Sequence, residues 1–442
     1  MRGKRSWAIL ATGIGIGLTL FAAGSFGTTR ALPTTQPGVD SFVATPAARS
    51  GATLAELIAS LQTRLQTVPG DHVGWATLGI AYVQQAKTTV DPTLYPRADG
   101  ALARSLEINQ ADNYLAYAGL SALSSARHDF TEARTFAQRG IAINAFNALL
   151  YGALSDAELQ LGNYDAALQA VQRMVDLSPD TASLSRASYT WELRGNINEA
   201  RRLMQRALDD APTAADRAFA LVQLGGLAGD QGDPNTALSH YVAALAASPS
   251  DVSALIGKAR SEAALGQTQT ALSDYGSAVT RAPEPGYIVE YARLLESVGQ
   301  TEQASEQYKV LAATQRLFAQ NGVEPDATTT LVDIDRGDVA KALGDAERAV
   351  ARRPFMDMHD AHAWALHATG RHQEALDAIN RARAFGTRKA LFEFHAGMIS
   401  LSLGDTVEAR TRLRSAVAID PAFDPLSAKV ARDTLASLEL AA

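Results

Sequence analysis

The chain has 442 residues and a formal net charge of −7, and this length exceeds what a single hydrophobic core holds, so several domains or a repeat array are expected. Alanine and leucine dominate, aromatic residues make up 7%, and alternating Val/Ile/Thr runs are absent, which favours an all-helical protein. The absence of clustered basic residues argues against nucleic-acid binding, and the absence of cysteine excludes disulfides, thiolate metal sites and thiol catalysis.

Residues 1–27 are predicted to form a signal anchor or a signal peptide. Three basic residues precede a run from Ser6 to Thr29 that has no charged side chain. The apolar part of this run approaches the ~20 residues of a membrane helix and exceeds the about 7–15 of a cleaved signal, so an anchor is preferred. The basic flank places the amino terminus in the cytoplasm. We therefore expect a cell-membrane protein with an extracytoplasmic body, or a secreted protein if the segment is cleaved, and no other membrane contact.

Two short segments connect this region to the body of the protein. Residues 28–52 are rich in Pro, Thr, Ala, Ser and Gly and have no periodicity, which predicts a flexible linker. Residues 53–71 are expected to contain a capping helix, because apolar residues recur there at helical spacing. These apolar residues are Leu54, Leu57, Ile58, Leu61 and Leu65.

Most of the remaining chain repeats with a period near 34 residues. The clearest copy is Ala218–Asp251, in which Leu221, Gly232, Ala237, Leu238, Tyr241, Ala244 and Pro249 return 34 positions later as Leu255, Gly266, Ala271, Leu272, Tyr275, Ala278 and Pro283. A fixed period of this length indicates a stack of helical hairpins. Each hairpin is too small to bury its apolar faces alone, so neighbouring units must pack together.

The array is expected to span residues 72–421, with a capping helix in residues 422–442. The first helices of about ten hairpins are predicted to begin at residues 72, 114, 148, 181, 218, 252, 285, 323, 356 and 390. Two segments depart from the pattern, an insertion at Lys87–Tyr95 and an extended second helix over 312–327. The second departure indicates either a break into two arrays near 320–330 or simple decay of the repeat.

The motif Trp75-x2-Leu78-Gly79-x2-Tyr82, together with the recurring Gly, Ala and Pro positions, resembles the tetratricopeptide repeat family. The resemblance covers most of the chain after residue 71. It implies a right-handed α-solenoid of helix-turn-helix repeats that serves as a scaffold or assembly factor and binds a protein or peptide on its concave surface.

The resemblance also implies that positions 2, 5, 9 and 12 of each first helix face the concave side. Large or charged side chains at these positions are the candidate binding residues, since aromatic and charged anchors often dominate interfaces. Trp364 could instead pack against its own neighbours. The candidates are Tyr189, Glu192, Arg260, Arg293, Glu296, Asp360, Trp364, Phe394 and Met398.

The sequence contains no motif for catalysis or for phosphate binding, and we expect a protein that is not an enzyme and that holds no cofactor or metal. One alternative is a metal-binding or enzymatic protein centred on His359, His362, His367 and His372, since His359 and His362 share a helix face. Another alternative is a structural envelope protein that makes its contacts through the outer surface. The identity of the partner and the oligomeric state do not follow from the sequence.

Overall fold

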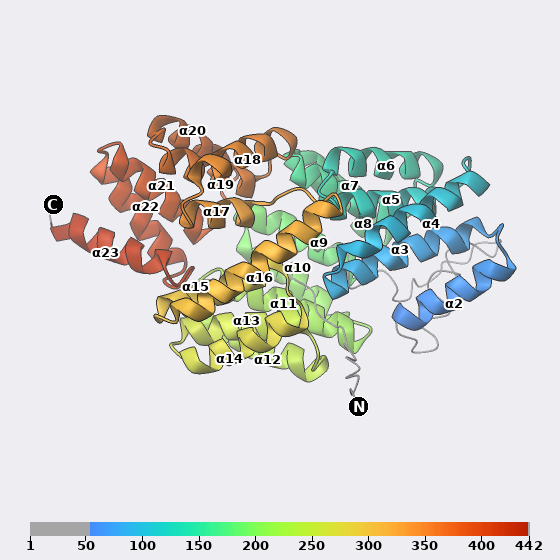
Figure 1. Ribbon diagram of the computed structural model, residues 1–442, viewed down its shortest axis with the longest axis horizontal. Helices are drawn as coiled ribbons and strands as arrows, with labels where there is room; N and C mark the ends of the chain where they lie inside the picture. The colour runs from blue at the N-terminus through green and yellow to red at the C-terminus, as the bar shows by residue number, and fades with distance from the viewer. Residues whose placement is uncertain (1–53, 441–442) are drawn as a thin grey trace, which may run out of the picture.

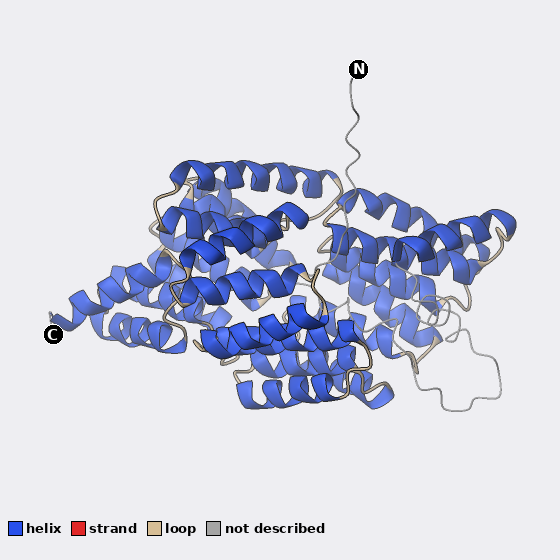
Figure 2. Cartoon of the chain, turned by 90° about the horizontal axis from the view of Figure 1, so that it is seen from below, coloured by secondary structure: helices blue, strands red, loops and turns tan. Residues whose placement is uncertain are grey.

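The computed structural model describes residues 54–440, which form the helices α2 to α23 and one short 3-10 helix, η1, and contain no strand (Figure 1, Figure 2). The expected all-α solenoid is confirmed. The expected anchor or signal at residues 1–27 and the expected linker at residues 28–52 lie outside the described residues. Within residues 54–440, none of the helices combines the length and the apolar character that crossing a bilayer requires.

Ten hairpins make up the array, and we number them repeats 1 to 10. Their first helices are α3 (His72–Thr89), α5 (Tyr114–Ala126), α7 (Ala148–Gln160), α9 (Thr181–Leu193), α11 (Ala214–Gly229), α13 (Val252–Ala264), α15 (Pro285–Ser297), α17 (Ala327–Asp335), α19 (Met356–Ala368) and α21 (Ala390–Ser402). Eight of these helices begin at the expected residue, whereas α11 and α17 begin four residues away from it.

The second helices complete the hairpins and contact the first helix of the next repeat. They are α4 (Tyr95–Ile108), α6 (Phe130–Ile143), α8 (Tyr164–Leu177), α10 (Ile197–Asp209), α12 (Pro234–Ala247), α14 (Thr268–Arg281), α16 (Thr301–Gln320), α18 (Val339–Arg352), α20 (His372–Arg383) and α22 (Thr406–Ile419). Helix η1 (Pro92–Leu94) precedes α4, and α2 (Leu54–Thr67) and α23 (Ser427–Leu440) pack at the two ends.

The most regular region shows why the repeated residue types are needed. Tyr241 in α12 is 2% exposed, and its ring lies against Gly225 in α11 and Gly257 in α13. A methyl group on Gly225 would lie only 2.8 Å from that ring, so small residues on the first helices make room for the large residue on the second. Asp251 caps α13 by accepting the Ala254 N–H at 3.0 Å, which satisfies an amide that the helix itself leaves free.

The superhelix winds past one full turn, so that its late repeats lie against the early ones. The turns between the two helices of repeats 2 to 5 contact the loops that precede or follow repeats 8 to 10, and we call this contact the seam. Figure 1 shows the orange and red helices of the late repeats beside the teal and green helices of the early ones. An open stack of repeats has contacts between neighbours only, and the seam adds contacts between residues that are more than 190 positions apart.

Hydrogen bonds cross the seam at three successive turns. The ring Nδ1 of His128 lies 2.7 Å from the carbonyl oxygen of Glu324, and because a carbonyl only accepts, this nitrogen carries the proton. The hydroxyl oxygen of Tyr164 accepts the N–H of Met356 at 3.0 Å. The hydroxyl of Thr387 donates to the backbone carbonyl of Leu193.

Apolar side chains fill the space between these hydrogen bonds. The ring of Tyr164 lies 4.0 Å from that of Phe385 and 6.2 Å from that of Phe355, measured between ring centroids. Leu193 and Met356 belong to the same buried cluster, and each is 1% exposed. Residues from repeats 3 and 4 therefore share one hydrophobic core with residues from repeats 9 and 10.

Both irregular segments of the sequence contact a distant part of the superhelix. Val90, in the insertion of repeat 1, packs against the core of repeats 6 to 8. Phe318 and Val323, at and beyond the end of the long helix α16, pack into the core of repeats 1 and 2. Val332 of α17 shares a core cluster with Leu311 of α16, so packing continues through residues 320–330. Both departures from the repeat pattern therefore coincide with contacts to distant repeats.

Substitution of Gly195 by Ala tests the seam. Gly195 has φ of +72°, and a methyl group there would overlap the carbonyl oxygen of Gly386 across the seam. Gly266 occupies the equivalent turn of repeat 6 with φ of +77° and has nothing within 4 Å of the added methyl. We expect Gly266→Ala to lower the free energy of unfolding by about 1–2 kcal/mol through its left-handed backbone alone.

We expect Gly195→Ala to cost at least about 1 kcal/mol more than Gly266→Ala, because overpacking adds to the backbone strain. Urea unfolding monitored by circular dichroism measures both values. Equal losses of unfolding free energy in the two variants would show that the turn of repeat 4 does not contact the loop that precedes repeat 10.

Candidate functional site

Charged side chains from six repeats gather on the inner side of the superhelix, and we call them the central charge cluster. Each of them is close enough to influence the pKa of at least one other member. They come from the middle and the late repeats, because the superhelical path brings repeats 9 and 10 close to repeats 4 and 5. The members are Glu192 in α9, Asp230 at the end of α11, Arg260 in α13, Glu290 in α15, Asp357 in α19 and Lys389 at the start of α21.

Two ion pairs account for four members of the cluster. Arg260 Nη2 lies 2.7 Å from Glu290 Oε1, and the hydroxyl of Tyr275 donates to the other Glu290 oxygen at 3.0 Å. Lys389 Nζ lies 2.6 Å from Asp357 Oδ1. In each pair the two charges neutralise each other within the protein. Each pair also holds the first helices of two successive repeats in a fixed relative position.

The other two members, Glu192 and Asp230, are carboxylates whose side chains form no ion pair or hydrogen bond within residues 54–440. Burial and, after it, the negative charge of Asp230 together raise the pKa of Glu192 to about 8, although Lys389 acts in the opposite direction. Burial also raises the pKa of Asp230, although Arg260 and Lys389 act in the opposite direction. Near neutral pH this pair can accept a cationic group or donate a hydrogen bond from its protonated form.

Three of the nine predicted binding residues lie at this cluster. Glu192 and Arg260 are members, and Tyr189 is adjacent, because burial followed by the charges of Asp357 and Glu192 raises its pKa well above the usual value. The sequence pattern did not single out Asp230, Glu290, Asp357 and Lys389. Among these four residues, only Asp357 could have been found from the sequence, because it occupies position 2 of its first helix, one of the positions expected to face the concave side.

Arg293 and Glu296 lie elsewhere and are used within the protein. The guanidinium of Arg293 makes two contacts with the carboxylate of Asp424, at 2.6 and 3.0 Å, and a further ion pair with Asp335. Glu296 accepts a hydrogen bond from the Tyr308 hydroxyl at 3.0 Å. Arg293 therefore links repeat 7 to the carboxyl-terminal segment. The sequence had instead predicted that Arg293 is available to a binding partner.

Two predicted binding residues, Asp360 and Phe394, are buried, with exposures of 2% and 4%, and so cannot reach a partner. Asp360 lies 2.8 Å from the ring of His395 on the next first helix. Position 5 is covered because neighbouring first helices approach closely in this tightly wound array.

Trp364 and Met398 are half-buried against the same carboxyl-terminal core as Phe394. The indole of Trp364 stacks on the rings of His395 and His367, with centroid distances of 4.2 and 4.8 Å. Trp364 therefore packs against its own neighbours, as one interpretation of the sequence expected. The two histidine rings cover its indole ring.

The histidines of the proposed metal site are spread over two helices. His367 and His372 approach each other with 3.2 Å between their Nδ1 atoms. Burial lowers the pKa values of His359 and His367 to about 4, which favours their neutral forms. Among residues 54–440 there is no group of three or more His, Cys, Asp or Glu side chains arranged to hold a metal ion.

A family model decides the relationship of this chain to known proteins. The tetratricopeptide repeat model matches residues 124–182, 222–286 and 331–390, which together sample the early, middle and late hairpins. These three segments of the chain are tetratricopeptide repeats. Repeats of this family typically mediate protein–protein interactions, and a comparison with curated protein sequences returned no match.

Three solved structures are similar to this chain at low sequence identity. A structure titled as the APC/C hetero-tetramer Cut9–Hcn1 is 14% identical, with 90% of this chain and 86% of that chain covered and a TM-score of 0.43. A tetratricopeptide repeat protein from Parabacteroides merdae is 17% identical, with coverage of 59% and 98% and a TM-score of 0.34. PilF from Pseudomonas aeruginosa is 15% identical, with coverage of 48% and 92% and a TM-score of 0.37.

The raised pKa of Glu192 predicts a pH dependence of stability. The carboxyl has a pKa of 4.5 in the unfolded chain and about 8 in the folded protein, so between these values the folded state binds more protons and stability falls as pH rises. We expect Glu192→Gln to unfold at a higher urea concentration than the parent at pH 8.5 and at a similar concentration at pH 5. The exposed Glu302→Gln serves as the matched control, and an identical pH profile for all three proteins would contradict the assignment.

A second prediction concerns Asp360 as a structural residue. Replacing it with Ala leaves His395 buried without its carboxylate partner, which we expect to cost about 1–3 kcal/mol of unfolding free energy. Asp377→Ala, at an exposed position of α20, should change the value by less than about 0.5 kcal/mol. Thermal and urea unfolding compare the two variants, and a loss as small as that of the control would reopen a binding role for Asp360.

Proposed function

We propose that this tetratricopeptide repeat protein is a scaffold or assembly factor that binds a protein or peptide partner on its inner, concave surface, outside the cytoplasm. On that surface, the central charge cluster contains two carboxylates, Glu192 and Asp230, that form no ion pair or hydrogen bond within residues 54–440. A partner segment that presents a lysine or arginine side chain would complement Glu192 and Asp230.

The observation that carries the proposal is the contrast between the paired and unpaired charges of the cluster. Arg260, Glu290, Asp357 and Lys389 already have partners at 2.6–2.7 Å, whereas the half-buried carboxylate of Glu192 and the exposed carboxylate of Asp230 form no ion pair or hydrogen bond within the described chain. Holding a partly desolvated carboxylate without a hydrogen-bonded counter-charge costs free energy. A cation from a partner would recover that cost and would add a charge-assisted hydrogen bond.

Site-specific photo-crosslinking tests which surface meets the partner. A photoreactive phenylalanine at Tyr189 reports on the inner surface, and the same residue at Val242, which is 49% exposed on α12, reports on the outer surface. We expect a crosslinked partner from position 189 only, and we expect Glu192→Gln to reduce its yield several-fold. Crosslinks from position 242 alone would instead support a structural envelope protein that makes contacts through its outer surface.

The extracytoplasmic location is part of the proposal and is supported by the uncharged run from Ser6 to Thr29 and its basic flank. Membrane fractionation followed by an alkaline wash separates an anchored chain from a released one. Intact mass of the mature protein shows whether the segment is cleaved. A full-length chain recovered in the cytoplasmic fraction would refute this part of the proposal.

A further inference from the structure

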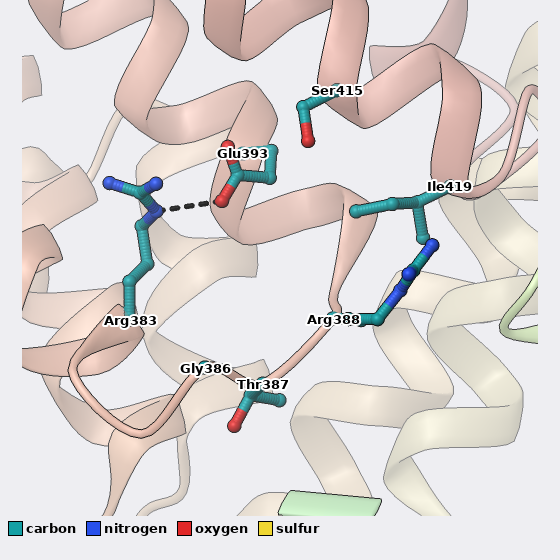
Figure 3. A pocket seen from close by; sticks show the side chains of 7 residues that line it. All are labelled: Arg383, Gly386, Thr387, Arg388, Glu393, Ser415 and Ile419. Atoms are coloured by element: carbon teal, nitrogen blue, oxygen red, sulfur yellow. Dashed lines mark hydrogen bonds and ion pairs between the residues drawn. The ribbon is translucent and has the colours of Figure 1, made fainter. Parts of the chain in front are cut away.

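A separate pocket of about 320 Å³ lies between repeats 9 and 10, close to the seam. Its size is at the lower end of the range for small-molecule sites. It is formed by the loop that joins the two repeats and by the facing sides of α21 and α22, as Figure 3 shows. The lining residues are Arg383, Gly386, Thr387, Arg388, Glu393, Ser415 and Ile419.

The pocket carries an excess of positive charge. Arg383 Nε donates to Glu393 Oε1 at 2.8 Å, and this same carboxylate also pairs with Arg412 at 3.2 Å. Arg412 is also paired with Glu408 at 2.6 Å, so within the lining Glu393 balances Arg383 and the excess positive charge is that of Arg388. Arg388 is exposed and forms no ion pair or hydrogen bond within residues 54–440, so its guanidinium keeps all five of its donors.

Polar groups on the other walls complement this charge. The hydroxyl of Ser415 forms no hydrogen bond with any described residue and is half-buried in the lining. Asp420, which follows the lining residue Ile419, turns away, because its carboxylate accepts the N–H of Ala422 at 2.8 Å. The lining therefore offers hydrogen-bond donors on two sides and no unpaired carboxylate.

The arginine-bearing loop is held in place before any ligand arrives. On one side of Arg388, the Thr387 hydroxyl donates to the Leu193 carbonyl across the seam. On the other side, Lys389 is paired with Asp357 at 2.6 Å. Fixing both neighbours lowers the entropy that a ligand must remove from the loop, which favours binding at a defined position.

We propose that this pocket binds an oxyanion, a phosphate or carboxylate group carried by a small molecule. Arg388 and the free edge of the Arg383 guanidinium hold the oxygens, and Ser415 donates one further hydrogen bond. Guanidinium groups match both kinds of oxyanion geometrically. The site is distinct from the central charge cluster, and its ligand is independent of the proposed protein partner.

Isothermal titration of the full-length protein at low ionic strength tests this proposal with inorganic phosphate and with succinate as probes. We expect saturable binding of at least one probe, and the probe that binds more tightly distinguishes a phosphate from a carboxylate ligand. Arg388→Gln should weaken binding tenfold or more. Arg381→Gln, an exposed arginine of α20 outside the lining, should leave it unchanged.

A second variant is expected to strengthen binding of the probe, and it therefore controls for loss of folding. Glu393→Gln keeps a hydrogen-bonding group next to Arg383 but removes the negative charge, so we expect it to tighten binding several-fold, which an unfolded protein cannot do. Absence of saturable binding of both probes to the parent protein would overturn the proposal. Equal affinities of the parent and Arg388→Gln, with unchanged circular dichroism, would overturn it as well.

Discussion

The contact between the early turns and the late loops determines most of the properties of this molecule. In an open repeat array each hairpin touches only its neighbours, and the concave surface faces solvent. Here the Tyr164 hydroxyl, the Leu193 carbonyl and the His128 ring all reach across to residues more than 190 positions later. The seam consequently brings Asp357 and Lys389 of the late repeats close to Glu192, and burial raises the pKa of this half-buried carboxyl.

The helical framework could be predicted from the sequence because its causes are local. The recurring glycine, alanine and proline positions act within a hairpin or between adjacent hairpins, so the 34-residue period placed eight of ten first helices at their observed starts. The seam could not be predicted in the same way, because it joins backbone carbonyls and turns that carry no pairwise sequence pattern. In the sequence the seam is indicated only by departures from the repeat pattern around Val90 and Phe318, two residues that are partly buried by distant repeats.

The surroundings of the candidate binding residues were predicted less well than the helices, and the residues show why. The position rule of the family found Tyr189, Glu192 and Arg260, which lie on the inner surface. It failed at Asp360 and Phe394, because close packing of neighbouring first helices covers position 5. It also failed at Arg293, whose partner Asp424 lies 131 residues later in the chain. Which charges remain available depends on the superhelical path, and that path follows from long-range contacts.

The long separation across the seam has a consequence for how the protein is made. Met356 follows Tyr164 by 192 residues, and a ribosome adds about 5–20 residues per second, so repeat 3 waits roughly 10–40 s for its contact. During that time Tyr164 and Leu193 expose apolar surface that the finished protein buries. Closing so long a loop also carries an entropic cost that local stacking avoids. Local stacking can therefore begin during synthesis, whereas formation of the seam must follow it, and the intermediate without the seam is the species most exposed to aggregation and to chaperones.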